Sequence, residues 1–391
     1  MFHNKIRNIL QETAERIEKL HVPYENEFKI QIQHLNLKEK SLLQEYLYAH
    51  EWNLGSARVL SMFKKARIVS ISEYVLRLHS KDAIQQVMND LLEAEPILLA
   101  ELISNSSRDS EVFTSLKDIL HESFSTVLDD LLENPSVIPF NYLEQLEPHL
   151  TDQEIERVRL QHLQLLLRKD CTCTLQEAIG RQEQWRSDAN RNKGTILGQM
   201  MRTVVQDTVC SFDTLLGAGE KLDANVSWKH YLTLLGIVAK AATSEYVNVL
   251  RVKGAVKNMF NKILADGRFE TLLLLMLTSR EICATDESIL GSYTSWYKYI
   301  IGEMTYRVDK AQFIAVMGLM NKLVPLEESV EILKVHASVS ISFPSLCMEH
   351  VVTFKNLCKS RIMNIEEAKC RQEGVQPLDP DISIVIDSDD D

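Results

Sequence analysis

The sequence predicts an all-α protein, an irregular multi-helix bundle or solenoid-like body that ends in a disordered acidic C-terminal tail. Glycine (13) and proline (9) are scarce among the 391 residues, compared with average usages of about 7% for glycine and about 5% for proline. Apolar residues recur at spacings of three and four. The chain is 45% hydrophobic, enough for one large core or two ordinary ones. We find no repeat of constant period, which disfavours a regular solenoid family.

The N-terminal part begins with an amphipathic pattern over residues 5–20 that predicts a helix. Residues 24–37 alternate around Phe28, so a short strand or an extended segment is an alternative there. Pro96 is expected to break or restart a helix over about 81–104, because proline lacks an amide donor and clashes with the preceding turn.

Three helix starts are predicted from capping-box spacing, in which a serine or threonine precedes a glutamate by three residues. Ser70, Thr151 and Thr174 each begin such a pattern. The hydroxyl oxygen can accept from a backbone amide while the glutamate reaches back to the cap residue.

Breaks between helical groups are expected at residues 134–150, 187–194 and 217–225, where proline, glycine and polar residues gather. They divide a helical interaction domain, residues 1–370, into sub-layers that we place at 1–133, 151–216 and 226–370. The remaining residues, 371–391, are assigned to the tail.

The region 226–300 is expected to be the most buried. A continuous apolar stripe runs through Val249, Val252, Val256, Met259 and Ile263. Residues 272–277 are apolar on every face, as in a helix enclosed by its neighbours. A final helix is expected from about Phe343 or Pro344 to Lys369.

Charge and cysteine usage narrow the class of protein. The net charge is 43 − 55 = −12. Residues 377–391 hold six acids and no base, so residues 1–376 carry a net charge of 43 − 49 = −6, which gives no global reason to expect nucleic acid as a partner.

Seven cysteines without a regular framework favour reduced thiols in cytosol or nucleus. Neither a signal peptide nor a membrane span is indicated, so we expect a soluble intracellular protein.

No catalytic motif is found, and we do not expect an enzyme. Residues 217–221 superficially resemble a phosphate loop, but the spacing and the following hydroxyl residue are missing. An enzyme with an unfamiliar helical site stays an alternative. It would gain support from a pocket that holds two or more convergent titratable groups.

Metal and cofactor sites are not predicted. Cys171 and Cys173 form a close thiol pair, but His149 and His162 complete no four-ligand set. We expect the other cysteines to be core thiols. Histidines within helical segments, such as His230 and His336, are expected to be packing or surface residues.

One helix, over residues 246–264, carries four bases and no acid. At 100° per residue, Lys253 and Lys257 share one side, and Arg251 and Lys262 share another. A solvated helix face is the simpler interpretation, and contact with DNA or with an acidic partner is the alternative.

The tail combines an aliphatic run with an acidic flank. This pattern resembles a SUMO-interacting motif, in which an extended segment adds to a sheet edge and its carboxylates meet a basic rim. An acidic solubilising terminus and a strand folded onto the body are alternatives. The candidate SUMO-binding residues are Ile382, Ile384, Val385, Ile386, Asp387, Asp389, Asp390 and Asp391. Ser388 is a candidate acidophilic phosphorylation site, whose phosphate would strengthen docking.

Together with the segment Trp228–Gly236, the helical body and this tail resemble the SUMO-interacting-motif-containing proteins whose helical domain is similar to non-SMC element five. The resemblance covers about residues 1–370. It implies a short isoform or a separately started helical domain, and a non-catalytic adaptor without cofactors. It also implies a helical partner subunit similar to non-SMC element six (the SMC five–six localisation factor).

Such a pair brings the SMC five–six genome-maintenance complex to SUMO-rich nuclear sites, including viral replication centres. The resemblance therefore implies SUMO or SUMOylated proteins as partners and a nuclear location, with cytoplasm as a second one. An alternative from the same resemblance is a platform that binds and restrains an intracellular calpain protease. The sequence leaves DNA contact open and gives no reason to expect a membrane.

Overall fold

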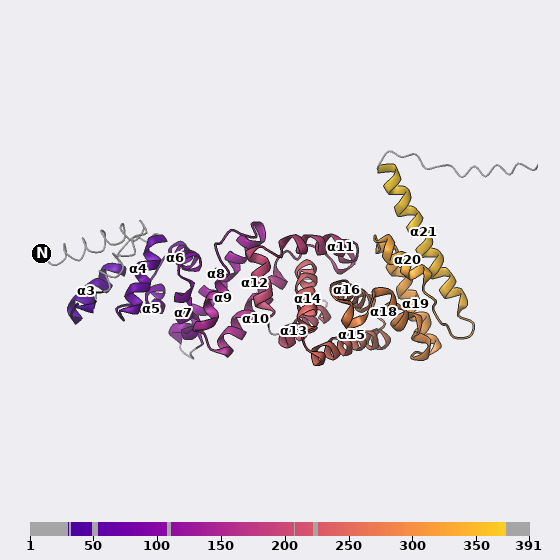
Figure 1. Ribbon diagram of the computed structural model, residues 1–391, viewed down its shortest axis with the longest axis horizontal. Coiled ribbons are helices and arrows are strands. Elements are labelled where there is room, and N and C mark those ends of the chain that lie inside the picture. Colours follow the sequence, from indigo (N-terminus) through magenta and orange to yellow (C-terminus); the bar gives the residue numbers. More distant parts are fainter. Residues whose placement is uncertain are drawn as a thin grey trace, which may run out of the picture. The chain divides into compact units, whose positions relative to one another are not determined.

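The computed structural model describes residues 30, 33–48, 54–107, 111–206, 208–221 and 226–372. Throughout these ranges the protein is all-α and contains no strand (Figure 1). The chain forms two compact units. The first lies within residues 1–170 and 187–211, and the second lies within residues 171–186 and 212–391. None of the described helices is long and apolar enough to cross a bilayer.

The first unit is built from short and medium helices joined by tight turns. Its elements are α3 (Leu37–Tyr48), α4 (Leu54–Lys65), α5 (Ile71–Leu76), α6 (Lys81–Ala94), the 3-10 helix η1 (Pro96–Leu98), α7 (Leu99–Ser106), α8 (Glu111–Glu133), α9 (Tyr142–Leu146), η2 (Glu147–His149), α10 (Asp152–Arg168) and α12 (Ile196–Val204). The helices α11 (Leu175–Asn192) and α13 (Thr208–Glu220) contribute residues to both units.

The core of the first unit gathers on α8, which packs against α6, α7, α10 and α12. Leu116, Leu120, Phe124 and Leu128 recur every four residues along α8 and are all buried. This period places them on one stripe of the helix, so that a single face of α8 contacts its neighbours.

The second unit consists of the beginning of α11, most of α13 and all later elements. These are α14 (Trp228–Ala242), α15 (Tyr246–Asp266), α16 (Phe269–Thr285), α17 (Glu287–Leu290), α18 (Tyr293–Tyr297), the π-helix η3 (Lys298–Gly302), η4 (Met304–Tyr306), α19 (Lys310–Leu323), η5 (Val324–Leu326), α20 (Val330–Ser338) and α21 (Met348–Gln372).

The enclosed helix of the second unit is α16, which α14, α15, α17, α18 and α19 contact. Every residue from Thr271 to Cys283 is buried, the apolar run 272–277 included. The stripe from Val249 to Ile263 on α15 is buried as well. The sequence prediction of a most buried region at 226–300 is therefore confirmed.

The three capping predictions are confirmed as helix starts. Thr151 and Glu154 form a complete capping box. Thr174 and Glu177 exchange the same pair of contacts, at 2.8 Å and 3.3 Å. Ser70 accepts from the Glu73 amide but donates its own hydroxyl to Glu101 Oε1 at 2.6 Å. Pro96 restarts the helix as predicted, between α6 and α7.

Two predicted breaks are wrong in part, at residues 187–192 and at residues 217–220. α11 continues through the polar run to Asn192, where Asp188 and Arg191 form an ion pair at 2.7 Å. Residues 217–220 are helical within α13, which also removes the likeness to a phosphate loop. A Cβ atom at Gly219 would lie 3.1 Å from Leu274 and Tyr231. Glycine serves close packing at this position, and no flexible turn is formed.

Two further boundaries differ from the sequence predictions. Within the segment 24–37, the described residues Ile30, Gln33 and Leu37 are helical, His34 lies in a turn, and Leu35 and Asn36 are in neither helix nor strand. The last helix begins at Met348, later than predicted. The preceding segment is pinned in a non-helical path, because the Ser342 amide donates to the Gly302 carbonyl at 2.8 Å and Leu346 adopts a φ of 66°.

Candidate functional site: a charged cavity in the second unit

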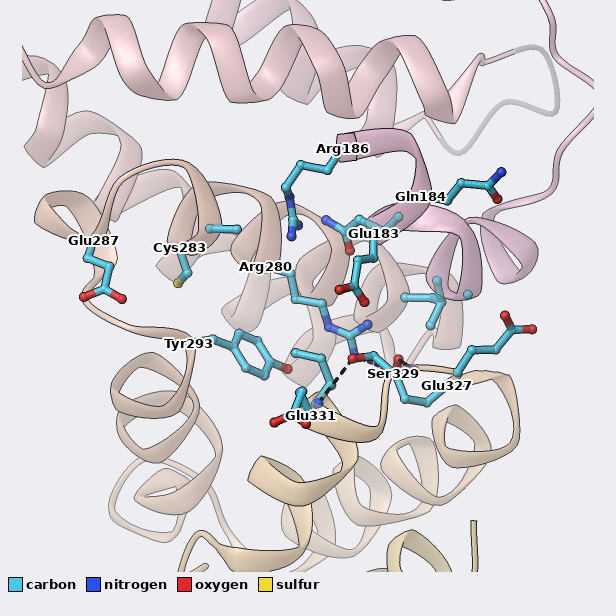
Figure 2. Close-up of a pocket in the computed structure, with 16 residues that line it drawn as sticks. Glu183, Gln184, Arg186, Arg280, Cys283, Glu287, Tyr293, Glu327, Ser329 and Glu331 are labelled. Carbon is cyan, nitrogen blue, oxygen red and sulfur yellow. Dashed lines mark hydrogen bonds and ion pairs between the residues drawn. The ribbon is translucent and has the colours of Figure 1, made fainter. Parts of the chain in front are cut away.

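A cavity of about 590 Å³ opens between α11, α16, α17, α18 and the N-terminal end of α20 (Figure 2). Its volume lies within the roughly 300–1,000 Å³ of small-molecule sites. Glu183, Glu287 and Glu331 are among its lining residues. The cavity wall is therefore rich in carboxylates.

The floor of the cavity holds an ion pair between Arg280 of α16 and Glu327, which precedes α20. Both side chains are almost fully buried, at 5% and 1% exposure. Figure 2 shows Arg280 and Tyr293 pointing toward one another, and the guanidinium carbon lies 5.7 Å from the ring centroid. Burial lowers the pKa of Arg280, but the Glu327 carboxylate and Tyr293 together outweigh this effect and leave the pKa raised. Arg280 therefore stays a cation.

Glu327 connects three helices through its own atoms. Besides the Arg280 contact, its Oε1 accepts from the Ser329 amide at 3.0 Å, beside the N-cap of α20. Its backbone carbonyl accepts from Arg361 Nε of α21 at 3.1 Å. The ion pair thus joins α16, α20 and α21 in the interior of the unit.

The wall on the α11 side is a second polar network. Gln182 Nε2 donates to the Leu277 carbonyl and to Glu281 Oε2, both at 3.0 Å. Arg186 Nη2 donates to the same Glu281 oxygen at 3.0 Å. Glu281 is 6% exposed in this ion pair, so its charge is balanced where it is buried.

Two further titratable groups near the cavity, His336 and Cys283, are held in their neutral forms. His336 Nε2 lies 2.9 Å from Tyr293 Oη, and its ring stacks on Tyr297 with centroids 4.5 Å apart. Burial, aided by the Arg280 charge, holds the pKa of His336 well below its usual range, so the ring is neutral. Burial and the nearby Glu287 raise the pKa of Cys283 to about 12, so the thiol is not a thiolate at neutral pH.

The cavity therefore does contain convergent titratable groups, the feature set out above as support for an enzyme. Glu327 in its lining and Glu281 beside it are buried carboxylates, and both are bound to arginines. General acid–base catalysis needs a group whose pKa lies near the working pH, and nucleophilic catalysis needs an activated nucleophile. The arrangement is suited to holding helices together, and the prediction that the chain is not an enzyme stays a prediction.

The four basic residues of α15 lie on two sides of the helix, as the helical angles predict. Arg251 pairs with Asp213, and Lys262 pairs with Glu220 at 2.6 Å, so both contact α13. Lys253 and Lys257 lie on the exposed side. The structure thus gives an intramolecular role to one pair of bases and leaves the other pair facing solvent.

The other predicted site residues have different outcomes. The candidate SUMO-binding residues from Ile382 to Asp391, and Ser388, lie outside the described residues. Cys171 and Cys173 are partly exposed. In the described ranges, no group of three or more histidine, cysteine or acidic residues has a metal-holding arrangement. His230 and His336 are buried packing residues, at 4% and 1% exposure.

Comparison with protein families gives one match, which spans most of the chain. The model of the Fanconi anaemia group A protein N terminus matches residues 10–367. The chain belongs to this family. No curated protein and no solved structure matches it.

The Fanconi anaemia group A family is one of nuclear genome-maintenance proteins, in agreement with the coarse expectation for this chain. The family match includes the cavity and α15. It ends before residue 382, so the aliphatic and acidic tail lies outside it.

The cavity network was missed at the sequence level, although one signal for it exists. Arg280 and Glu281 are charged residues within a helix that is apolar on all faces over 272–277. Enclosed charges need partners, but Glu327 and Gln182 come from distant parts of the chain. The need for partners was visible in the sequence, whereas their identity was not.

Proposed function

We propose that this chain is a non-catalytic adaptor of nuclear genome maintenance. Its helical body binds a helical partner subunit similar to non-SMC element six, and the pair recruits the SMC five–six complex. Its tail binds SUMO and directs the assembly to SUMO-rich nuclear sites, such as viral replication centres. One observation carries the proposal: a body matched over residues 10–367 by a genome-maintenance family precedes a tail of different composition outside the match.

The body supports a binding role more than a catalytic one. Its charged cavity has buried carboxylates neutralised by arginines and a protonated thiol. Helical bodies of this kind present apolar and polar areas side by side, as protein–protein interfaces do. The resemblance of the sequence to the SUMO-interacting-motif-containing proteins supports the same proposal.

The tail supports SUMO as its partner. β-Branched residues at positions 382, 384, 385 and 386 can fill a groove while the backbone pairs with a sheet edge. The following acids suit a basic rim. Phosphorylation of Ser388 adds negative charge at the same place, and we expect it to raise the affinity.

The test uses the full chain and a truncation after Gly374. Titration calorimetry measures SUMO binding, and co-purification from nuclear extract reports the partners of the body. We expect truncation to abolish SUMO binding while helicity and the SMC five–six subunits are retained. Equal SUMO affinity of the two proteins would contradict the role of the tail. Absence of the SMC five–six subunits from both purifications would contradict the role of the body.

A further inference from the structure

The outer face of α15 exposes large apolar side chains at its N-terminal end. Tyr246, Val247 and Leu250 are 73%, 72% and 48% exposed. They lie opposite the buried stripe that packs α15 into the second unit. Single exposed apolar residues are ordinary, but a group on one helix face is typical of an interaction site. We call this group, together with Lys253, Gly254 and Lys257, the α15 outer face.

The two lysines of the α15 outer face form no ion pair with any residue that the structure describes. The other bases of the helix, Arg251 and Lys262, are neutralised by α13. The positive charge that remains is therefore local, within a body whose net charge is negative. An acidic partner is the complement of this pair.

Gly254 independently indicates that the backbone of another molecule approaches α15 closely. It is exposed in the middle of α15, and a Cβ added there would meet nothing within 4 Å. Glycine destabilises an interior helical position relative to alanine, and no intramolecular contact requires it here. A glycine on an exposed ridge lets another backbone come close. With Tyr246 and Leu250, it forms an i, i+4, i+8 ridge.

We propose that the α15 outer face binds an acidic amphipathic helix of the partner protein. The i, i+4, i+8 ridge fits the groove of a second helix. Apolar residues of that helix pack against Tyr246, Val247 and Leu250, its backbone approaches Gly254, and its carboxylates pair with Lys253 and Lys257. The inference rests on the proposed adaptor function and assigns its partner a docking face (α15 in Figure 1).

DNA is the competing occupant, and the same residues disfavour it. Two lysines neutralise few phosphates, so the electrostatic gain is small. Val247 and Leu250 gain nothing from a phosphate backbone, and Arg251 is already bound to Asp213.

Cross-linking identifies the occupant directly. The full chain is co-expressed with the helical subunit of the proposed function, and a photoreactive phenylalanine replaces Tyr246. A matched control places it at Tyr306, which is 80% exposed on η4. We expect position 246 to cross-link to an acidic amphipathic segment of the subunit, and position 306 to give no such product. Cross-links from 246 to DNA, to a second copy of the chain, or to nothing would overturn the assignment.

A stability-matched pair of variants separates binding from folding. Gly254→Gln should raise the melting temperature, because glutamine favours helix, yet weaken partner binding at least tenfold by blocking close approach. Gly318→Gln is the control, because Gly318 is also exposed in a helix with nothing within 4 Å. It should raise the melting temperature and leave affinity unchanged. Equal affinity of both variants would overturn the inference.

A double charge reversal, Lys253→Glu with Lys257→Glu, should also weaken binding at least tenfold and reduce its dependence on salt. SUMO titration of the same proteins should stay unchanged. If the unmodified chain fails to bind the subunit, the proposed function is wrong and this inference fails with it. If the unmodified chain and all variants bind alike, only the docking face is wrong.

Discussion

Tyr142 and Tyr297 are both fully buried phenols, and their hydroxyl groups have opposite surroundings. Tyr142 Oη lies 2.6 Å from His162 Nε2, while His162 Nδ1 donates to the Val158 carbonyl at 2.8 Å. A carbonyl only accepts, so Nε2 must be the acceptor for the Tyr142 hydroxyl. The Tyr297 hydroxyl has no hydrogen-bond partner within the described part of the chain. Residue type alone gave no hint of this difference.

Removing these hydroxyl groups should therefore have unequal effects on stability. Tyr142→Phe should destabilise by about 1–3 kcal/mol, because it leaves His162 Nε2 buried without a partner. Tyr297→Phe should be neutral or slightly stabilising, because no bond is lost. Urea unfolding of the two variants measures the difference, and a larger loss for Tyr297→Phe would contradict it.

In the tail, Ile384 and Val385 are expected to matter more than the serine before them. Ile384→Ala with Val385→Ala removes apolar side chains that would fill the SUMO groove, and it should weaken binding by roughly 2–4 kcal/mol. Ser383→Ala is the matched control and should change affinity little. Calorimetric titration with SUMO checks both, and similar affinities for the two proteins would speak against groove filling.

At the scale of elements, α16 shows how an enclosed helix accommodates charge. Its apolar run packs against five neighbouring helices, and Arg280 and Glu281 still lie within the same buried stretch. Each charge has a specific partner, Glu327 for Arg280 and Arg186 for Glu281. Because those partners come from α11 and from the start of α20, the pairs fix the register of three helices around one cavity.

Breaking the deeper pair should be costly. Glu327→Gln should destabilise by about 3–5 kcal/mol, because it leaves the Arg280 cation buried without a carboxylate. Glu327→Leu combined with Arg280→Met should recover much of that loss, because no buried charge remains. Asp188→Asn, which removes a partly exposed ion pair with Arg191, serves as the control and should move the unfolding midpoint little. A mild effect of Glu327→Gln, comparable to the control, would show that Arg280 reaches solvent.

Across the whole molecule, each unit buries a histidine in its neutral form. Burial lowers the pKa of His162 to about 4 and holds that of His336 well below its usual range. In the unfolded chain a histidine has a pKa of about 6.5. Between these values the unfolded chain binds protons that the folded chain does not, so stability is present above pH 6.5 and is lost as pH falls toward 4.

From pH 7 to pH 5, His162 alone should lower the free energy of unfolding by about 2 kcal/mol. Urea unfolding across this range measures the slope, and His162→Gln should reduce it. An NMR titration that places the pKa of His162 near 6.5 would contradict the prediction.

The sequence by itself determined the helical class, the capped helix starts, the buried stripe of α15 and the enclosure of α16. These features follow from local periodicity and capping chemistry, which are properties of neighbouring residues. It also determined which bases of α15 share a side. Two of its errors, at residues 187–192 and 217–220, came from polar and glycine-rich runs that also suit a solvated or closely packed helix.

Tertiary structure alone decided which charges meet. Arg280 with Glu327 and Arg186 with Glu281 join positions far apart in the chain, and no periodicity within one helix encodes such pairs. It also decided that Arg251 and Lys262 are bound to α13, whereas Lys253, Gly254 and Lys257 remain on the outer face. Side-chain spacing fixes the face of a helix, but only the packing of neighbouring helices determines whether that face is already covered.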